Sequence, residues 1–183
     1  MKKTLACILV TLVDAAMAQP FYLRQSLQGV DFEVQSLNEG SINEVQISTT
    51  QTLGVGSQVT VEAMGTVVGA DVGDLDADGH PEVYVFVNSA GSGSYGQLIA
   101  YASNKGKSIT PVHLPDLPPA LAKGYMGHDE FMIGENRLLR RFPIYKEGNV
   151  NAEPTGGMRQ IQYRLIPGEA GWLLETDRTF DLP

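Results

Sequence analysis

The sequence predicts an all-β protein: a single antiparallel β-sandwich or partly closed barrel with long loops and at most one short helical turn. Apolar and polar residues alternate in several short runs, as in strands with one face in solvent. Twenty glycines and ten prolines among 183 residues favour frequent turns. The sequence has no internal repeat of the kind that indicates a propeller or a solenoid.

The strands are predicted from short patterned runs. Those with one exposed face are residues 31–35, 42–47, 59–63, 160–165 and 172–174. Residues 83–87 are apolar at every position, which indicates a central strand covered on both faces. A further strand is expected at 97–101. A single helical turn is expected at residues 118–123, where two prolines begin the segment and Gly124 ends it.

The first 18 residues have the pattern of a cleavable Sec signal peptide. Lys2 and Lys3 precede an apolar run, and Ala16-Met17-Ala18 supplies the small residues that a signal peptidase requires. The apolar run is too short to span a bilayer, so no membrane anchor is expected. We therefore expect cleavage near Ala18, a single β-rich domain over residues 19–183 and a periplasmic location.

Cysteine usage and charge narrow the function further. Cys7, the only cysteine, lies within the predicted signal peptide, so the mature protein is expected to have no disulfide, thiol nucleophile or thiolate metal site. The net charge of −8 disfavours nucleic acid as a partner. Such acidity suits a basic protein partner. The alternative is that acidity only keeps an exported protein soluble.

An acidic loop precedes the central strand. Asp74, Asp76, Asp78 and Glu82 occupy positions 1, 3, 5 and 9 of a loop with Gly79 at position 6, a spacing like that of the oxygen ligands of a calcium loop. No helical pattern flanks the loop, which excludes a helix-loop-helix calcium site. Calcium would be structural here, and no other cofactor is expected. The alternative is an acidic turn without metal, in which the aspartates accept hydrogen bonds from turn amides.

A glycine-serine-tyrosine segment, residues 91–96, follows the central strand. It includes Ser92, Gly93, Ser94 and Tyr95 and is expected to form the tip of a hairpin. Serine and tyrosine hydroxyls can donate to carboxylates without adding charge, and tyrosine supplies rigid contact area. A phosphate-binding loop is disfavoured, because neither a suitably placed lysine nor a helix start follows. A plain flexible hairpin is the alternative interpretation.

Taken together, these segments resemble the bacterial periplasmic inhibitors of I-type (invertebrate-type) lysozyme. The resemblance rests on Asp74-Leu-Asp-Ala-Asp-Gly-His-Pro-Glu-Val83 followed by Ser89-Ala-Gly-Ser-Gly-Ser-Tyr-Gly96. Two later segments add to it, Arg137-Leu-Leu-Arg-Arg-Phe-Pro-Ile-Tyr145 and Asn151-Ala-Glu-Pro-Thr-Gly-Gly-Met-Arg-Gln-Ile-Gln-Tyr163. The similarity covers residues 32–174.

The resemblance implies a non-enzymatic inhibitor that helps bacteria to evade host defence. Its Ser-Gly-x-Tyr loop would enter the cleft of a host I-type lysozyme, with Ser92 and Tyr95 bonded to the catalytic carboxylates and Gly93 and Ser94 shaping the tip. Four arginines are candidates for a second contact: Arg137, Arg140, Arg141 and Arg159. Edge strands are compatible with a homodimer.

Two other function classes remain open. The first is a calcium-stabilised exported β module that binds carbohydrate or an envelope protein through the acidic loop. The second, an envelope hydrolase, is disfavoured because no nucleophile–base pair is evident. The adjacent His128, Asp129 and Glu130 would point to alternating faces of a strand and so would not converge on one site.

Overall fold

The computed structural model describes residues 19–51, 56–104, 107–150 and 153–183, which form twelve strands and no helix. The predicted signal peptide lies outside the described residues. The strands are β1 (Phe21–Leu27), β2 (Val30–Ser36), β3 (Asn43–Gln51), β4 (Gly56–Ala63), β5 (Thr66–Gly73), β6 (Glu82–Asn88), β7 (Gly96–Ser103), β8 (Ile109–His113), β9 (Glu130–Gly134), β10 (Arg137–Pro143), β11 (Met158–Gly168) and β12 (Gly171–Leu182). Within these ranges no helix is long and apolar enough to cross a membrane.

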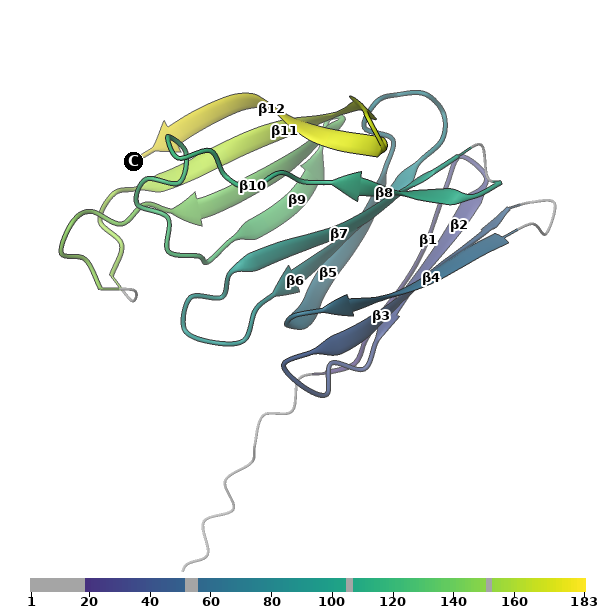
Figure 1. The fold of residues 1–183 in the computed structure, drawn as a ribbon, viewed down its shortest axis with the longest axis horizontal. Coiled ribbons are helices and arrows are strands. Elements are labelled where there is room, and N and C mark those ends of the chain that lie inside the picture. The colour runs from purple at the N-terminus through teal and green to yellow at the C-terminus, as the bar shows by residue number, and fades with distance from the viewer. Residues whose placement is uncertain (1–18, 52–55, 105–106, 151–152) are drawn as a thin grey trace, which may run out of the picture.

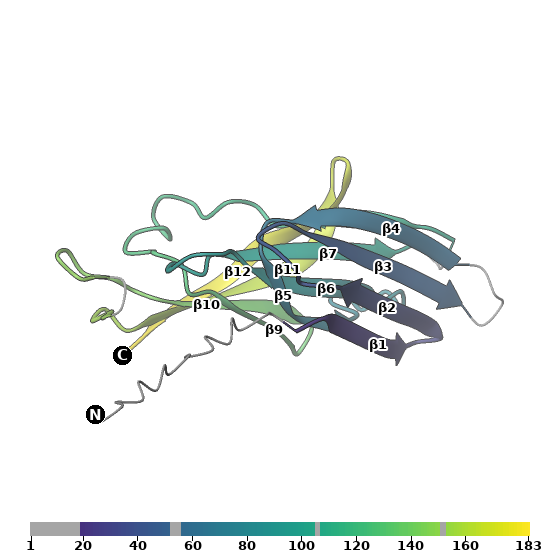
Figure 2. The same ribbon diagram turned by 90° about the horizontal axis from the view of Figure 1, so that it is seen from below.

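Two sheets make up the fold. A four-stranded meander in the order β1-β2-β3-β4 packs on a longer, strongly curved sheet in the order β5-β6-β7-β8-β12-β11-β10-β9 (Figure 1). Figure 2 shows the meander strands side by side in sequence order. The eight-stranded sheet is nearly closed and barrel-like. The predicted all-β class, between a sandwich and a partly closed barrel, is confirmed.

One pairing differs from the antiparallel expectation. Strands β8 and β12 run parallel where Trp172 pairs with Val112 and Leu173 with His113. All other strand pairs in the described part of the chain are antiparallel. The long connection from β8 to β9 lets β8 border β12, so the sheet curls round without a local hairpin at this point.

The apolar side chains form two cores on either side of β6. Its odd-numbered residues Val83, Val85 and Val87 pack against the meander, in the core that includes Phe32 and Ile47. The neighbouring Tyr84 points the other way, into the interior of the curved sheet. Alternate side chains of a strand face opposite sides of its sheet, so a strand with a core on each side must be apolar throughout. The prediction for residues 83–87 is therefore confirmed.

The predicted alternation also identifies which side chains of the meander face the core. Phe32, Val34, Val45 and Ile47 are fully buried between polar neighbours. Ile42 is an exception, because β3 begins one residue later and leaves this side chain 57% exposed.

The predicted helical turn is present as a single turn. The amides of Leu121 and Ala122 both donate to the Pro118 carbonyl, at 2.8 and 2.9 Å, and the chain then continues without a helix. Gly124 has a positive φ of 75°, a conformation that ends a helical turn. This turn lies in the long loop between β8 and β9, which reaches the same end of the molecule as the β6–β7 hairpin tip (Figure 1).

Candidate functional site

The glycine-serine-tyrosine segment forms the closed tip of the β6–β7 hairpin. The strands separate at the Asn88–Gly96 pair. Just beyond it, the Ser89 amide donates to the Tyr95 carbonyl and the Tyr95 amide donates to the Ser89 hydroxyl, each at 2.9 Å. These two bonds fix the base of the tip, so the loop continues from a rigid strand pair.

Ser92, Gly93, Ser94 and Tyr95, the four predicted binding residues, all lie on this tip. Ser92 is exposed, and the Tyr95 side chain remains 49% exposed although it is aromatic. Gly93 and Ser94 are half-buried. Ser94 has a positive φ of 41°, and its amide donates to the Gly91 carbonyl at 3.2 Å. The tip thus presents hydroxyl groups and an aromatic ring on a tightly turned backbone.

A second loop, residues 124–129, braces the tip from the side. The His128 amide donates to the Gly93 carbonyl at 2.7 Å. Gly127 makes this approach possible: its φ is 91°, and a Cβ at this position would lie only 2.0 Å from the Gly93 oxygen. The Tyr95 ring also meets the edge of the Tyr125 ring, with centroids 5.6 Å apart. The tip is therefore held by the fold and is not a free hairpin end.

A buried ion pair anchors the bracing loop. Asp129 accepts a hydrogen bond from the guanidinium of Arg140 at 2.7 Å, and both side chains are almost completely buried. The other Asp129 oxygen accepts from the Gly96 amide at 2.7 Å and from the Tyr125 hydroxyl. One carboxylate thus joins β10, the bracing loop and the first residue of β7.

The protonation states in this network follow from its geometry. Burial by itself would lower the pKa of Arg140, but the adjacent Asp129 carboxylate more than offsets this and leaves the pKa raised. Burial and the bond to Asp129 raise the pKa of Tyr125 as well, so its hydroxyl keeps its proton and donates. Arg140 therefore stays charged and Tyr125 stays protonated near neutral pH.

Sequence reasoning missed the role of Asp129. The expected alternation of His128, Asp129 and Glu130 along one strand is wrong, because β9 begins only at Glu130 and His128 lies in the preceding loop with a positive φ of 59°. The partner of Asp129 is Arg140 on β10, the strand that pairs with β9. No sequence motif marks Arg140.

The four arginines expected to be candidates for a second contact all have partners within the protein. The pairs are Arg137 with Asp177 (2.9 Å), Arg140 with Asp129 (2.7 Å), Arg141 with Gln160 (2.5 Å) and Arg159 with Asp181 (2.7 Å). Arg140 is the most deeply buried of them, and it contacts the bracing loop through Asp129 and Tyr125.

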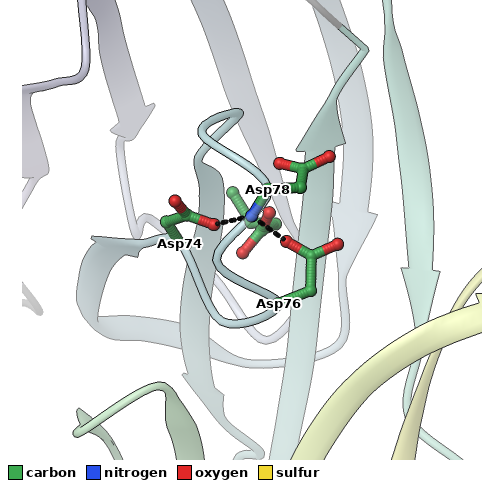
Figure 3. A group of neighbouring side chains, drawn as sticks. Asp74, Asp76 and Asp78 are labelled. Carbon is green, nitrogen blue, oxygen red and sulfur yellow. Dashed lines mark hydrogen bonds between the residues drawn. The ribbon is translucent and has the colours of Figure 1, made fainter.

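The acidic loop connects β5 to β6 and gathers its carboxylates in a small space. One oxygen from each of Asp74, Asp76, Asp78 and Glu82 lies within 4.8 Å of the others, so this group could hold a metal ion. Figure 3 shows the first three of these side chains around the turn, with the Asp78 amide donating to Asp74 and to Asp76.

The same aspartates also satisfy amides of the turn. Asp74 accepts from the amides of Asp78 and Gly79 at 3.1 and 3.0 Å, and Asp78 accepts from the His80 amide at 2.7 Å. An ionised carboxylate offers about four acceptor sites, so these bonds leave lone pairs for a cation. The loop thus has the geometry expected of an Asx-type turn together with a donor set of hard oxygen atoms that suits calcium.

Glu82 differs from the three aspartates because it is 1% exposed. Its carboxyl group accepts from the Leu75 amide at 3.0 Å and the Tyr84 hydroxyl at 3.1 Å. Burial raises the pKa of Glu82 to about 8, because the charged form loses its hydration there and the two hydrogen bonds only partly compensate. A cation bound to the loop would favour the ionised form instead.

The chain matches no protein-family model and no curated protein.

Proposed function

We propose that this protein is a periplasmic, non-enzymatic inhibitor of lysozyme, with I-type lysozyme as its target. The segment Ser92-Gly93-Ser94-Tyr95 would enter the active-site cleft of the enzyme. The observation that carries the proposal is the braced tip, which exposes a serine and a tyrosine. Its main chain is held at the base by one backbone hydrogen bond and one bond to the Ser89 hydroxyl, and from the side by the His128 amide.

A braced tip favours tight binding because little conformational entropy is lost on association. A flexible loop loses about 0.5–1.5 kcal/mol for each side chain that becomes fixed, and more for its backbone. Here the contacts of Gly93 with the bracing loop and of Tyr95 with Tyr125 exist before any partner arrives. The tip would therefore act as a preformed hot spot within an interface of roughly 1,600 Å².

The chemistry of the tip suits the cleft of a glycosidase. Lysozyme cleaves its glycan with two carboxyl groups, one of which donates a proton while the other stabilises or attacks the sugar carbon. Neutral hydroxyls on Ser92 and Tyr95 can donate hydrogen bonds to both groups without introducing like-charge repulsion. A net charge of −8 on the chain would in addition speed the encounter with a basic enzyme.

The test is a titration of residues 19–183 into I-type, chicken-type and goose-type lysozymes. The measured quantity is the rate at which each enzyme lyses permeabilised bacterial cells. We expect near-stoichiometric, competitive inhibition of the I-type enzyme. Failure to inhibit any of the three classes would refute the proposal.

The acidic loop favours a second candidate function, a calcium-stabilised exported β module that binds carbohydrate or an envelope protein. Four converging carboxylates beside the central strand support it. Calcium at this loop would fix the start of β6, which leads directly to the tip, so structural calcium is compatible with either function.

Calcium binding is tested by thermal unfolding in EDTA and in about 1 mM free Ca²⁺. A site with a dissociation constant of about 10 μM would stabilise the protein by about 2.7 kcal/mol at that concentration. Asp76→Asn should abolish the shift, whereas Glu169→Gln, at an exposed carboxylate in the turn between β11 and β12, should retain it. An identical melting temperature with and without calcium would show that the acidic loop binds no calcium at this concentration.

A further inference from the structure

A groove of about 450 Å³ lies beside the tip. Tyr95 and Gln97 line it from the hairpin, and Leu114, Asp116 and Leu117 line it from the loop that follows β8. Arg140 also lines it. The groove therefore lies between the half-exposed Tyr95 of the tip and the loop that follows β8.

The unmatched charge in this groove is negative. Arg140 is neutralised by Asp129 at 2.7 Å and also donates to the Tyr125 hydroxyl at 2.9 Å. Asp116, by contrast, is exposed and forms no salt bridge with any residue that the structure describes. A ligand in the groove therefore meets one free carboxylate and no free cation.

The remaining lining is suited to an aliphatic chain. Leu114 and Leu117 are half-buried, belong to the same loop as Asp116 and line the groove with it. Lysine and arginine side chains combine an apolar stem with a charged end, and they bury the stem along apolar surface while the charge seeks a partner. A groove lined by two half-buried leucines and one exposed carboxylate suits a side chain of that kind.

We propose that this groove receives a basic side chain, lysine or arginine, from the same partner whose cleft accepts the tip. The inference rests on the proposed function. When the tip enters the active-site cleft, the residues at the edge of the cleft come to lie against the surface beside the tip. Tyr95 belongs to both the tip and the groove, so this surface includes the groove. The stem of the basic side chain would lie against Leu114 and Leu117, and its charge would pair with Asp116. This contact would serve as the second attachment point of the inhibitor.

Four variants test the assignment, in two pairs matched for charge. Asp116→Asn and Asp116→Lys change the groove, while Glu169→Gln and Glu169→Lys change an exposed carboxylate in the turn between β11 and β12 by the same number of charges. Long-range steering depends on net charge and acts on the association rate. Asp116→Asn and Glu169→Gln therefore share the same change in steering, as do Asp116→Lys and Glu169→Lys. A local contact at Asp116 appears as a faster dissociation from I-type lysozyme for the Asp116 variant than for the Glu169 variant of the same charge.

At about 0.15 M salt we expect Asp116→Asn to raise the dissociation rate threefold to tenfold and Asp116→Lys to raise it by about tenfold to a hundredfold. Both Glu169 variants should stay within about twofold of the wild type. The effect of Asp116→Asn should shrink at about 1 M salt, where the screening length falls to about 3 Å.

Equal dissociation rates for Asp116→Lys and Glu169→Lys would overturn the groove assignment while leaving the tip proposal intact. A wild-type protein that does not bind lysozyme would overturn both. Unfolding midpoints of all four variants, expected to equal that of the wild type because the substituted residues are exposed, separate these outcomes from a folding defect.

Discussion

Substitution of Asp129 by alanine should destabilise the whole protein and loosen the tip, although Asp129 lies outside it. The variant leaves the Arg140 guanidinium buried without its anion, since the two side chains are 0% and 8% exposed in the native pair. Removing one member of a buried ion pair costs about 3–5 kcal/mol. The Gly96 amide and the Tyr125 hydroxyl lose their acceptor at the same time.

We therefore expect Asp129→Ala to lower the free energy of unfolding by about 4 kcal/mol, a large part of the 5–15 kcal/mol typical of a domain. Urea denaturation followed by the fluorescence of Trp172 measures it. With an m-value of about 2 kcal/mol/M the midpoint should fall by about 2 M. The variant should also inhibit lysozyme more weakly, because the bracing loop no longer holds the Gly93 carbonyl.

The control is Glu175→Ala, which removes the partner of Arg164 at the surface. The Arg164 and Glu175 side chains are 51% and 42% exposed, so the loss should stay below about 1 kcal/mol. A loss below about 1 kcal/mol for Asp129→Ala as well would refute the reasoning, because it would show that Arg140 is well solvated or pairs elsewhere.

Two further predictions concern the bracing glycine and the acidic loop. Gly127→Ala should weaken lysozyme inhibition about tenfold or more, because its Cβ would lie 2.0 Å from the Gly93 oxygen and displace the tip; inhibition equal to that of the wild type would show that the brace is irrelevant. In EDTA, the free energy of unfolding should fall as pH rises from about 5 to about 8. The pKa of Glu82 is ordinarily 4.5 and rises to about 8 in the folded protein, so over this range Glu82 holds its proton only in the folded state. Urea denaturation at both pH values measures this slope, which Glu82→Gln should flatten; a wild-type stability that rises over the same window would contradict the assignment.

The strands of the meander and the central strand could be predicted because their burial is visible in local patterning. Phe32 and Val34 alternate with polar residues on a sheet with one exposed face, and residues 83–87 are apolar throughout because a core lies on each side. These patterns depend only on the period of a strand and on which faces are covered.

The order of strands in the eight-stranded sheet could not be predicted in the same way. The parallel pairing of Trp172 with Val112 joins segments about sixty residues apart, as the two residue numbers show. Local patterning contains no information on which strands become neighbours over such a separation. Strands β1, β5, β8, β9 and β10 were not predicted. In β1 the alternation is interrupted, because Tyr22 lies on the exposed face and Gln25 on the inner face.

The tip residues were predicted as one group because they are contiguous, whereas their brace was not. The Gly127–Gly93 approach and the Asp129–Arg140 pair depend on two loops and a strand that meet only in the folded protein. Glycine and aspartate at these positions have many other roles in proteins, so residue type alone does not reveal the contact. The groove beside Tyr95 could not be predicted either, because its lining comes from four separate segments.

The central claim is that the hydroxyl groups of the tip block the cleft of I-type lysozyme. The most direct measurement compares the inhibition constant of the wild type with that of Ser92→Ala/Tyr95→Phe, which removes both hydroxyls and keeps the aromatic ring. We expect the inhibition constant to rise about a hundredfold, roughly 1.5 kcal/mol for each hydrogen bond to a charged group, with an unchanged unfolding midpoint. An inhibition constant equal to that of the wild type would contradict the claim.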